Sequence, residues 1–122
     1  MRQIGYISAC IAGDYRYTSR VYVTLSEDGD VCEIVRSERA PVGGMDGPGG
    51  SYDAGVHFRC TLRGDEITPK AIVSAIWRSF DSIITDYGKP TKNFEWSRRD
   101  RWDPKVKGIS QAKVAKILKE WQ

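Results

Sequence analysis

The sequence predicts an α+β fold, in which an antiparallel sheet of four to five strands from the N-terminal half is packed by two C-terminal helices. Strand-like runs separated by turns fill residues 1–66, and helical patterns begin after residue 67 and again after residue 109. A chain of 122 residues is long enough for one domain with one hydrophobic core. We therefore expect a single domain, residues 1–122, with the sheet in 1–66 and a helical part, basic toward its end, in 67–122.

Four runs in the N-terminal half are predicted to be strands, at residues 4–11, 20–25, 31–36 and 56–62. The second run alternates cleanly, with Val21, Val23 and Leu25 on one side. After it, Ser-Glu-Asp-Gly-Asp at residues 26–30 predicts a hairpin turn of the Asp-Gly type. Because no helical pattern lies between the strands, we expect an antiparallel meander with one buried face.

The fourth predicted strand carries the only histidine of the chain, His57. Strand alternation places His57 and Arg59 together on the face opposite Phe58, and a polar function of the sheet would be found there. The alternative is a histidine that is only solvated or hydrogen-bonded, without a catalytic role.

A glycine-rich stretch at residues 40–57 contains half of the chain's 12 glycines, so its backbone can reach positive φ angles and approach a ligand closely. Gly44 and Gly49 have the spacing of a phosphate-binding P-loop, but Gly50 and Ser51 follow where Lys and Ser or Thr are needed. A strand-like run then follows in place of an opening helix, which also excludes the dinucleotide-binding fingerprint. Long loops are usually functional or disordered. The loop, taken as residues 40–55, is therefore either a binding loop or a flexible connection.

Thr68 and Pro69 predict the start of the first helix, as the N-cap and the first helical residue. Apolar residues then repeat at helical spacing from Ile72 to Tyr87, and Gly88 is a typical residue to end the helix. This helix is expected to form the core against the sheet.

A second helix is predicted for residues 111–122, with Ser110 as its N-cap. Its apolar stripe consists of Val114, Ile117, Leu118 and Trp121. A helix this short needs a partner surface, either the chain's own sheet or another copy of the chain.

Composition excludes a membrane-spanning protein, because no apolar run approaches the ~20 residues that cross a bilayer. The N-terminus lacks the long apolar segment of a secretion signal, so we expect a cytoplasmic protein. Cys10, Cys32 and Cys60 are far apart, without a Cys-x-x-Cys pair, and each is expected to be a buried thiol. No metal site and no cofactor are predicted.

Charge is distributed unevenly along the chain. Residues 1–88 hold 9 Lys and Arg against 12 Asp and Glu, whereas residues 89–122 hold 10 against 4. In residues 89–108, aromatic side chains (Phe94, Trp96, Trp102) are interleaved with arginines (Arg98, Arg99, Arg101). Aromatic rings stack on nucleobases, and guanidinium groups bind phosphate oxygens. The alternative is that the aromatics attach a long connection to the core while the arginines face water.

The order of motifs resembles the Thoeris anti-defence sponge family, small phage proteins that capture the cyclic ADP-ribose signals of bacterial TIR-domain enzymes. The resemblance covers nearly the whole chain. It rests on Ile4-Gly5-Tyr6-Ile7, Gly13-Asp14-Tyr15-Arg16-Tyr17, the loop from Ala40-Pro41-Val42-Gly43-Gly44 to Ser51-Tyr52-Asp53, Ile67-Thr68-Pro69-Lys70, and Gly108-Ile109-Ser110.

The resemblance implies an antiparallel sheet with two C-terminal helices, assembly through dimers into a hexamer, and nucleotide sites at protomer interfaces. The ligand would be a cyclic ADP-ribose-type nucleotide such as glycocyclic ADP-ribose, held in the cytoplasm of an infected bacterial cell. Some members are also described as holding cyclic oligonucleotides at separate sites. A nucleic-acid polymer is not an expected partner.

Chemistry and location, guided by this resemblance, select ten candidate ligand-binding residues. Around the base and ribose we expect Phe80, Tyr87, Asn93 and Trp96. For the phosphates we expect Arg98, Arg99 and Lys113, with the backbone amides of Gly43, Gly44 and Gly50 closing over them. Lys113 lacks the bidentate geometry that an arginine would supply.

The predicted mechanism is sequestration without cleavage, so the protein is not expected to be an enzyme: tight binding at sufficient copy number lowers the free ligand below the effector's threshold. One alternative is a nucleic-acid-binding protein that uses the basic C-terminal segment and whose affinity depends strongly on salt. Another is a phosphodiesterase with His57 as its acid or base.

Overall fold

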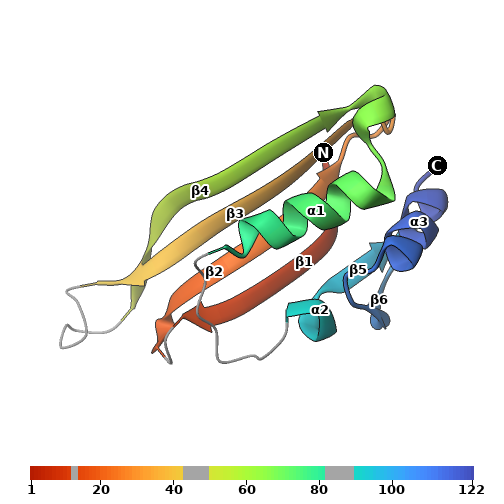
Figure 1. Cartoon of the computed structure of the whole chain (residues 1–122). Helices are drawn as coiled ribbons and strands as arrows, with labels where there is room; N and C mark the ends of the chain where they lie inside the picture. The colour runs from red at the N-terminus through yellow and green to blue at the C-terminus, as the bar shows by residue number, and fades with distance from the viewer. Residues whose placement is uncertain (12–13, 43–49, 82–89) are drawn as a thin grey trace.

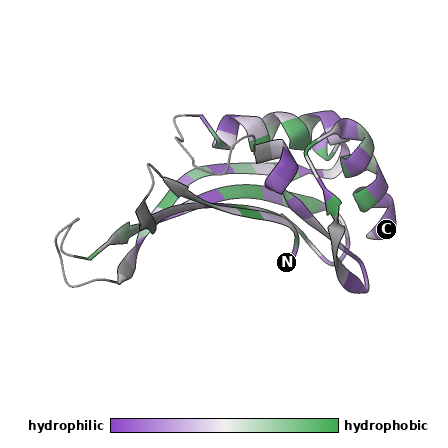
Figure 2. Cartoon of the chain, turned by 90° about the horizontal axis from the view of Figure 1, so that it is seen from below, coloured by the Kyte–Doolittle hydropathy of each residue, from purple (hydrophilic) through white to green (hydrophobic). Residues whose placement is uncertain are grey.

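The computed structural model describes residues 1–11, 14–42, 50–81 and 90–122. The strands are β1 (Arg2–Ile11), β2 (Asp14–Leu25), β3 (Val31–Pro41), β4 (Ser51–Arg63), β5 (Glu95–Arg98) and β6 (Arg101–Lys107). The helices are a 3-10 turn, η1 (Gly64–Glu66), followed by α1 (Pro69–Ser79), α2 (Pro90–Asn93) and α3 (Gln111–Glu120). The strands form one antiparallel sheet in the order β4-β3-β2-β1-β5-β6 (Figure 1). Figure 2 shows the helices gathered on one face of this curved sheet. The predicted α+β class is confirmed.

The sheet has six strands, more than the four to five that the sequence predicts. The additional strands, β5 and β6, come from the part of the chain that we expected to be helical. They form a short hairpin that joins the sheet where Gly5 of β1 pairs with Trp96 of β5. The arginines and lysines of this hairpin obscure the alternation of apolar and polar residues that identifies a strand in a sequence. The hairpin joins the sheet through the pairing of β5 with β1.

The glycine-rich stretch is partly strand. Residues 51–55 belong to β4, and Ala40 and Pro41 end β3, so the loop is shorter than the predicted 40–55. The amide of Val42 donates to the carbonyl of Gly50 at 3.2 Å, which closes the hairpin. Residues 43–49 lie outside the described part of the chain.

Both predicted N-caps are confirmed. The Thr68 hydroxyl accepts the amide hydrogen of Ala71 at 3.1 Å, and the Ser110 hydroxyl accepts that of Lys113 at 3.2 Å. However, α1 ends at Ser79, well before the predicted end near residue 87, and residues 82–89 are not described. The early end has a local cause, because the Ser79 hydroxyl donates back to the carbonyl of Ile76.

One core lies between the sheet and helices α1 and α3. The predicted stripes are confirmed at most described positions: the completely or almost completely buried residues include Val21, Val23, Ile34, Ile72, Ile76, Val114 and Ile117. Trp77, which shares the apolar pattern of α1, is instead 42% exposed. Phe94 and Trp96, which flank Glu95 at the start of β5, are also fully buried and extend the core to the additional hairpin. None of the helices among the described residues is long and apolar enough to cross a bilayer.

Burial raises the pKa of the Cys32 thiol from 9.0 to about 12, with smaller contributions from Cys60 and Glu33. Because this pKa is higher in the folded state, the unfolded state loses the proton first as pH rises. The stability that the buried neutral thiol contributes is complete below pH 9 and is lost as pH rises through about 12.

We therefore expect a pH dependence of stability that belongs to Cys32. Raising the pH from about 8 to about 10.5 should lower the free energy of unfolding of the native protein by about 2 kcal/mol more than that of Cys32→Ala. Urea unfolding of both proteins at the two pH values measures the difference. Parallel losses of stability in the two proteins would contradict the expectation.

Candidate functional site

The structure distributes the predicted ligand residues over several places. Arg98 and Arg99 lie at the turn between β5 and β6, and Asn93 ends α2, beside a hollow that Tyr6 and Lys107 also line. Lys113 lies on α3, where its ammonium donates to the carbonyl of Lys107. Gly50 precedes β4 with a φ of +90°. Tyr87, Gly43 and Gly44 lie outside the described residues.

Two of the aromatic residues predicted to contact the ligand pack in or against the hydrophobic core. Trp96 is 0% exposed and its indole N–H donates to the carbonyl of Gly108 at 2.7 Å, so in this chain it offers no face to a base. Phe80, directly after α1, is half-buried against the core and meets Trp77 edge-on, with ring centroids 6.3 Å apart. The prediction that Trp96 contacts the ligand is therefore wrong. Trp96 is a core residue, because its side chain is buried between the sheet and the helices.

A groove forms where the start of β1, the turn between β2 and β3, and the end of the chain meet; Figure 1 shows these segments at the same end of the molecule. We call it the terminal groove. It consists of two adjoining hollows that share Leu25, Glu27, Arg99 and Trp121 in their linings. The hollow that Arg2 lines measures about 240 Å³ and the adjoining one about 310 Å³, whereas small-ligand sites usually measure roughly 300–1,000 Å³.

Local hydrogen bonds position the groove's side chains. The indole N–H of Trp121 donates to the carbonyl of Ser97 at 2.8 Å, which fixes the ring beside the β5 strand. A guanidinium nitrogen of Arg99 donates to the carbonyl of Gln122 at 3.0 Å. Arg2 of β1 pairs with Leu25 of β2, so β1 brings a second arginine to the hollow. The hollow is thus lined by two guanidinium groups and one indole ring.

The opposite wall of the groove is the predicted hairpin turn at residues 26–30. Ser26 donates its hydroxyl hydrogen to a carboxylate oxygen of Asp28 at 2.7 Å, and the amide of Asp30 donates to the same oxygen at 3.0 Å. These bonds hold the pKa of Asp28 below its usual value, the contact with Ser26 contributing most. Gly29 adopts the positive φ of +76° that the turn requires. Asp28 is thus an ionised, structural member of the turn.

The charges of the groove are of both signs. Arg2 and Arg99 line it and are exposed, as is Glu27. Arg98, one of the predicted phosphate ligands, does not line it and forms an ion pair with Glu120 of α3. Of the groove's residues, sequence reasoning selected only Arg99. It missed Arg2 and Glu27, and it assigned Trp121 only to the apolar stripe of the last helix. Nothing local in the sequence could have joined them, because they come from opposite ends of the chain.

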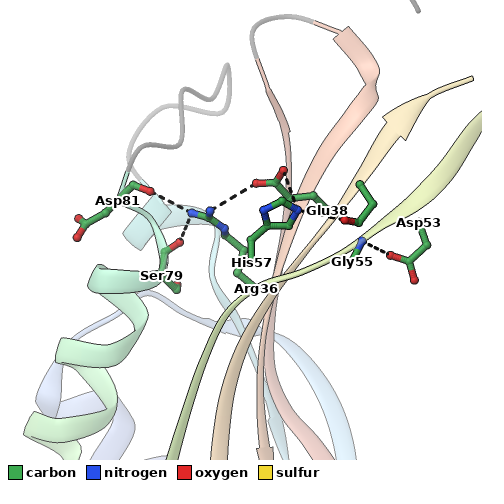
Figure 3. A network of polar contacts seen from close by, with 8 residues as sticks. Arg36, Glu38, Asp53, Gly55, His57, Ser79 and Asp81 are labelled. Atoms are coloured by element: carbon green, nitrogen blue, oxygen red, sulfur yellow. Dashed lines mark hydrogen bonds and ion pairs between the residues drawn. The ribbon is translucent and has the colours of Figure 1, made fainter. Parts of the chain in front are cut away.

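A second polar cluster lies at the C-terminal end of α1 (Figure 3). Arg36 of β3 donates from one guanidinium nitrogen to the carbonyl of Ser79 at 2.7 Å and to that of Asp81 at 3.0 Å. Its other terminal nitrogen lies 3.6 Å from a carboxylate oxygen of Glu38. A cation that donates to the last carbonyls of a helix also interacts favourably with the helix dipole. The cluster therefore attaches α1 to the sheet.

His57 belongs to this second cluster, and its predicted position is wrong. Its Nε2 lies 3.6 Å from Glu38 Oε2 and 3.2 Å from the carbonyl oxygen of Ala54. The cause is a β-bulge: Arg36 pairs with Phe58 and Ser37 with Val56, which leaves His57 without a cross-strand partner and turns it toward Glu38.

Arg59 lies on the other side of β4 from His57. Its guanidinium pairs with the carboxylate of Glu33 on the neighbouring strand, with the nearest nitrogen and oxygen 2.8 Å apart. The bulge therefore separates two residues that strand alternation predicts to be together.

Comparison of this chain with protein-family models, with curated proteins and with solved structures finds no significant match.

Proposed function

We propose that this protein binds a cyclic ADP-ribose-type nucleotide, such as glycocyclic ADP-ribose, and sequesters it without cleaving it. In an infected bacterium, this capture would block the signalling of TIR-domain enzymes and so protect a phage. The observation that carries the proposal is that Trp121, Arg2 and Arg99 line one groove although they come from distant parts of the chain. The resemblance of the sequence to the Thoeris anti-defence sponges supports the same class of ligand.

The terminal groove has the side chains that such a ligand needs. An indole stacks on a nucleobase, and a stacked base contributes about 1–3 kcal/mol to binding. The guanidinium groups of Arg2 and Arg99 can donate to the oxygens of a diphosphate, in hydrogen bonds strengthened by the charges on both sides. Both arginines are exposed, so they can also attract an anion from solution.

Retention of the intact nucleotide is supported by the position of the chain's only histidine. His57 does not line the terminal groove; it lies in the Arg36 cluster at the end of α1. A protein that only binds competes with the effector by affinity and copy number, and each tenfold gain in affinity corresponds to about 1.4 kcal/mol.

The proposal includes self-association into a dimer or hexamer in the cytoplasm of the infected cell, as the resemblance implies. The described surface offers apolar side chains for such contacts. Tyr52 and Val56, on the edge strand β4, are each 53% exposed.

Mass spectrometry tests capture directly. The purified protein is mixed with glycocyclic or canonical cyclic ADP-ribose, unbound nucleotide is removed, and the protein is denatured by heat. We expect intact nucleotide in the supernatant, in stoichiometric amount. A supernatant without nucleotide would overturn the proposal and favour a polynucleotide ligand, and a ring-opened product would identify an enzyme.

Single substitutions then test the terminal groove. We expect Arg2→Ala and Arg99→Ala each to weaken nucleotide binding about 10- to 100-fold, since a hydrogen bond to a charged group contributes about 1.5–3 kcal/mol. Calorimetric titration measures the affinities. Arg101→Ala is the matched control, because Arg101 is exposed on the same hairpin but does not line the groove. Equal affinities of all four proteins would place the nucleotide elsewhere.

A further inference from the structure

Two side chains of opposite charge line the same hollow of the terminal groove but do not interact with each other. Arg2 and Glu27 are both exposed and both belong to the lining. Among the described residues, the side chain of neither forms a hydrogen bond or an ion pair. The hollow therefore presents a free guanidinium and a free carboxylate to whatever enters it.

The other acidic residue of the groove is already occupied. Asp28 accepts hydrogen bonds from Ser26 and Asp30, which its role in the turn requires. Glu27 is adjacent in the same turn, but its carboxylate oxygens are available to a ligand. A carboxylate repels phosphate, so it must face a part of the ligand that donates hydrogen bonds.

A ribonucleotide offers such a part in its sugar. If the base stacks on Trp121 and the phosphates contact Arg2 and Arg99, the ribose connects them, and each hydroxyl of that ribose that does not close the ring of the nucleotide is a donor. A carboxylate oxygen can accept the hydrogen of such a hydroxyl. An acidic side chain plays this role toward the ribose 2′-hydroxyl in dinucleotide-binding folds.

We infer that Glu27 makes the terminal groove selective for ribose over 2′-deoxyribose by accepting hydrogen bonds from the sugar hydroxyls. The inference rests on the proposed function, because it assumes that a nucleotide occupies the groove. It adds the group that recognises the sugar and the property of the ligand that is recognised.

Titration of cyclic ADP-ribose and of its 2′-deoxy analogues into the full chain tests the inference. We expect the native protein to prefer the ribose form about 10- to 100-fold, the effect of losing a hydrogen bond to a charged group. In Glu27→Gln and Glu27→Ala this preference should fall at least tenfold, mainly through weaker binding of the ribose form. Glu27 is exposed in a turn, so both variants should fold, and their thermal unfolding confirms it.

Asp81→Asn is the matched control, since it removes one exposed carboxylate at the end of α1 and should keep the preference. Equal binding of ribose and deoxyribose forms by the native protein would overturn the inference and leave the proposed function intact. A preference that survives in both Glu27 variants would also overturn it. Absence of binding by either nucleotide would instead overturn the proposed function, and the inference with it.

Discussion

Gly5→Ala is expected to destabilise the protein by about 3 kcal/mol, the upper part of the usual cost of overpacking a core. A Cβ atom at residue 5 would lie 2.6 Å from Cε1 of Phe94 and 2.7 Å from Cζ3 of Trp96. Both rings are fully buried, their centroids are 4.8 Å apart, and Trp96 is also held by its hydrogen bond to Gly108. Neither ring can move aside without losing contacts, so the strain would fall on the pairing of β1 with β5.

Chemical denaturation of Gly5→Ala measures this cost. Ser8→Ala, on the same strand, is the control and should change the free energy of unfolding by less than about 0.5 kcal/mol. Combining Gly5→Ala with Phe94→Leu should cost less than the sum of the two single changes, because the smaller side chain leaves room for the methyl group. A Gly5→Ala protein as stable as the native one would contradict the close packing.

Arg36→Ala is expected to cost about 3 kcal/mol, because it removes the only arginine beside the buried carboxylate of Glu38 among the described residues and leaves it next to His57 alone. The side chains of Arg36 and Glu38 are 13% and 10% exposed. The substitution also removes the guanidinium nitrogen that donates to the carbonyls of Ser79, the last residue of α1, and of Asp81. We expect a lower free energy of unfolding and faster hydrogen exchange at the end of α1.

Arg59→Ala is the matched control for Arg36→Ala. Arg59 also pairs with a glutamate, Glu33, but its side chain is 54% exposed, and exposed pairs contribute about 0–1 kcal/mol. Adding Glu38→Gln to Arg36→Ala should recover part of the lost stability, since it removes the buried charge that has lost its guanidinium partner. Equal costs for the two arginine variants in urea unfolding would show that burial does not determine the energy of these pairs.

The features that sequence predicts well depend on neighbouring residues. A hydroxyl at Thr68 or Ser110 caps the helix that starts beside it, and Gly29 supplies the positive φ of a turn whose other residues are adjacent. Apolar spacing likewise identifies the buried face of each helix, because that face is set by the helical repeat. The α+β class follows from these local signals.

The features that sequence reasoning mispredicted depend on residues far apart in the chain. Trp96 stands among arginines and suggests a ligand contact, yet the absence of a side chain at Gly5 opens a buried space for its ring. Alternation places His57 beside Arg59, but one bulge opposite β3 reverses its direction. The binding of a nucleotide and the part of Arg99 in it remain predictions, which mass spectrometry and calorimetric titration of Arg99→Ala test.

The sequence by itself determined the α+β class, the four long strands, the main turn, the starts of α1 and α3, and most of the apolar faces that form the core. Each of these is a matter of local backbone preference and of the period at which apolar side chains recur. Tertiary structure alone decided that a charged hairpin completes the sheet and that Arg2, Glu27 and Trp121 share a groove. Strand pairing brings together residues that are far apart in the sequence, and no spacing pattern in the sequence indicates that such residues will meet.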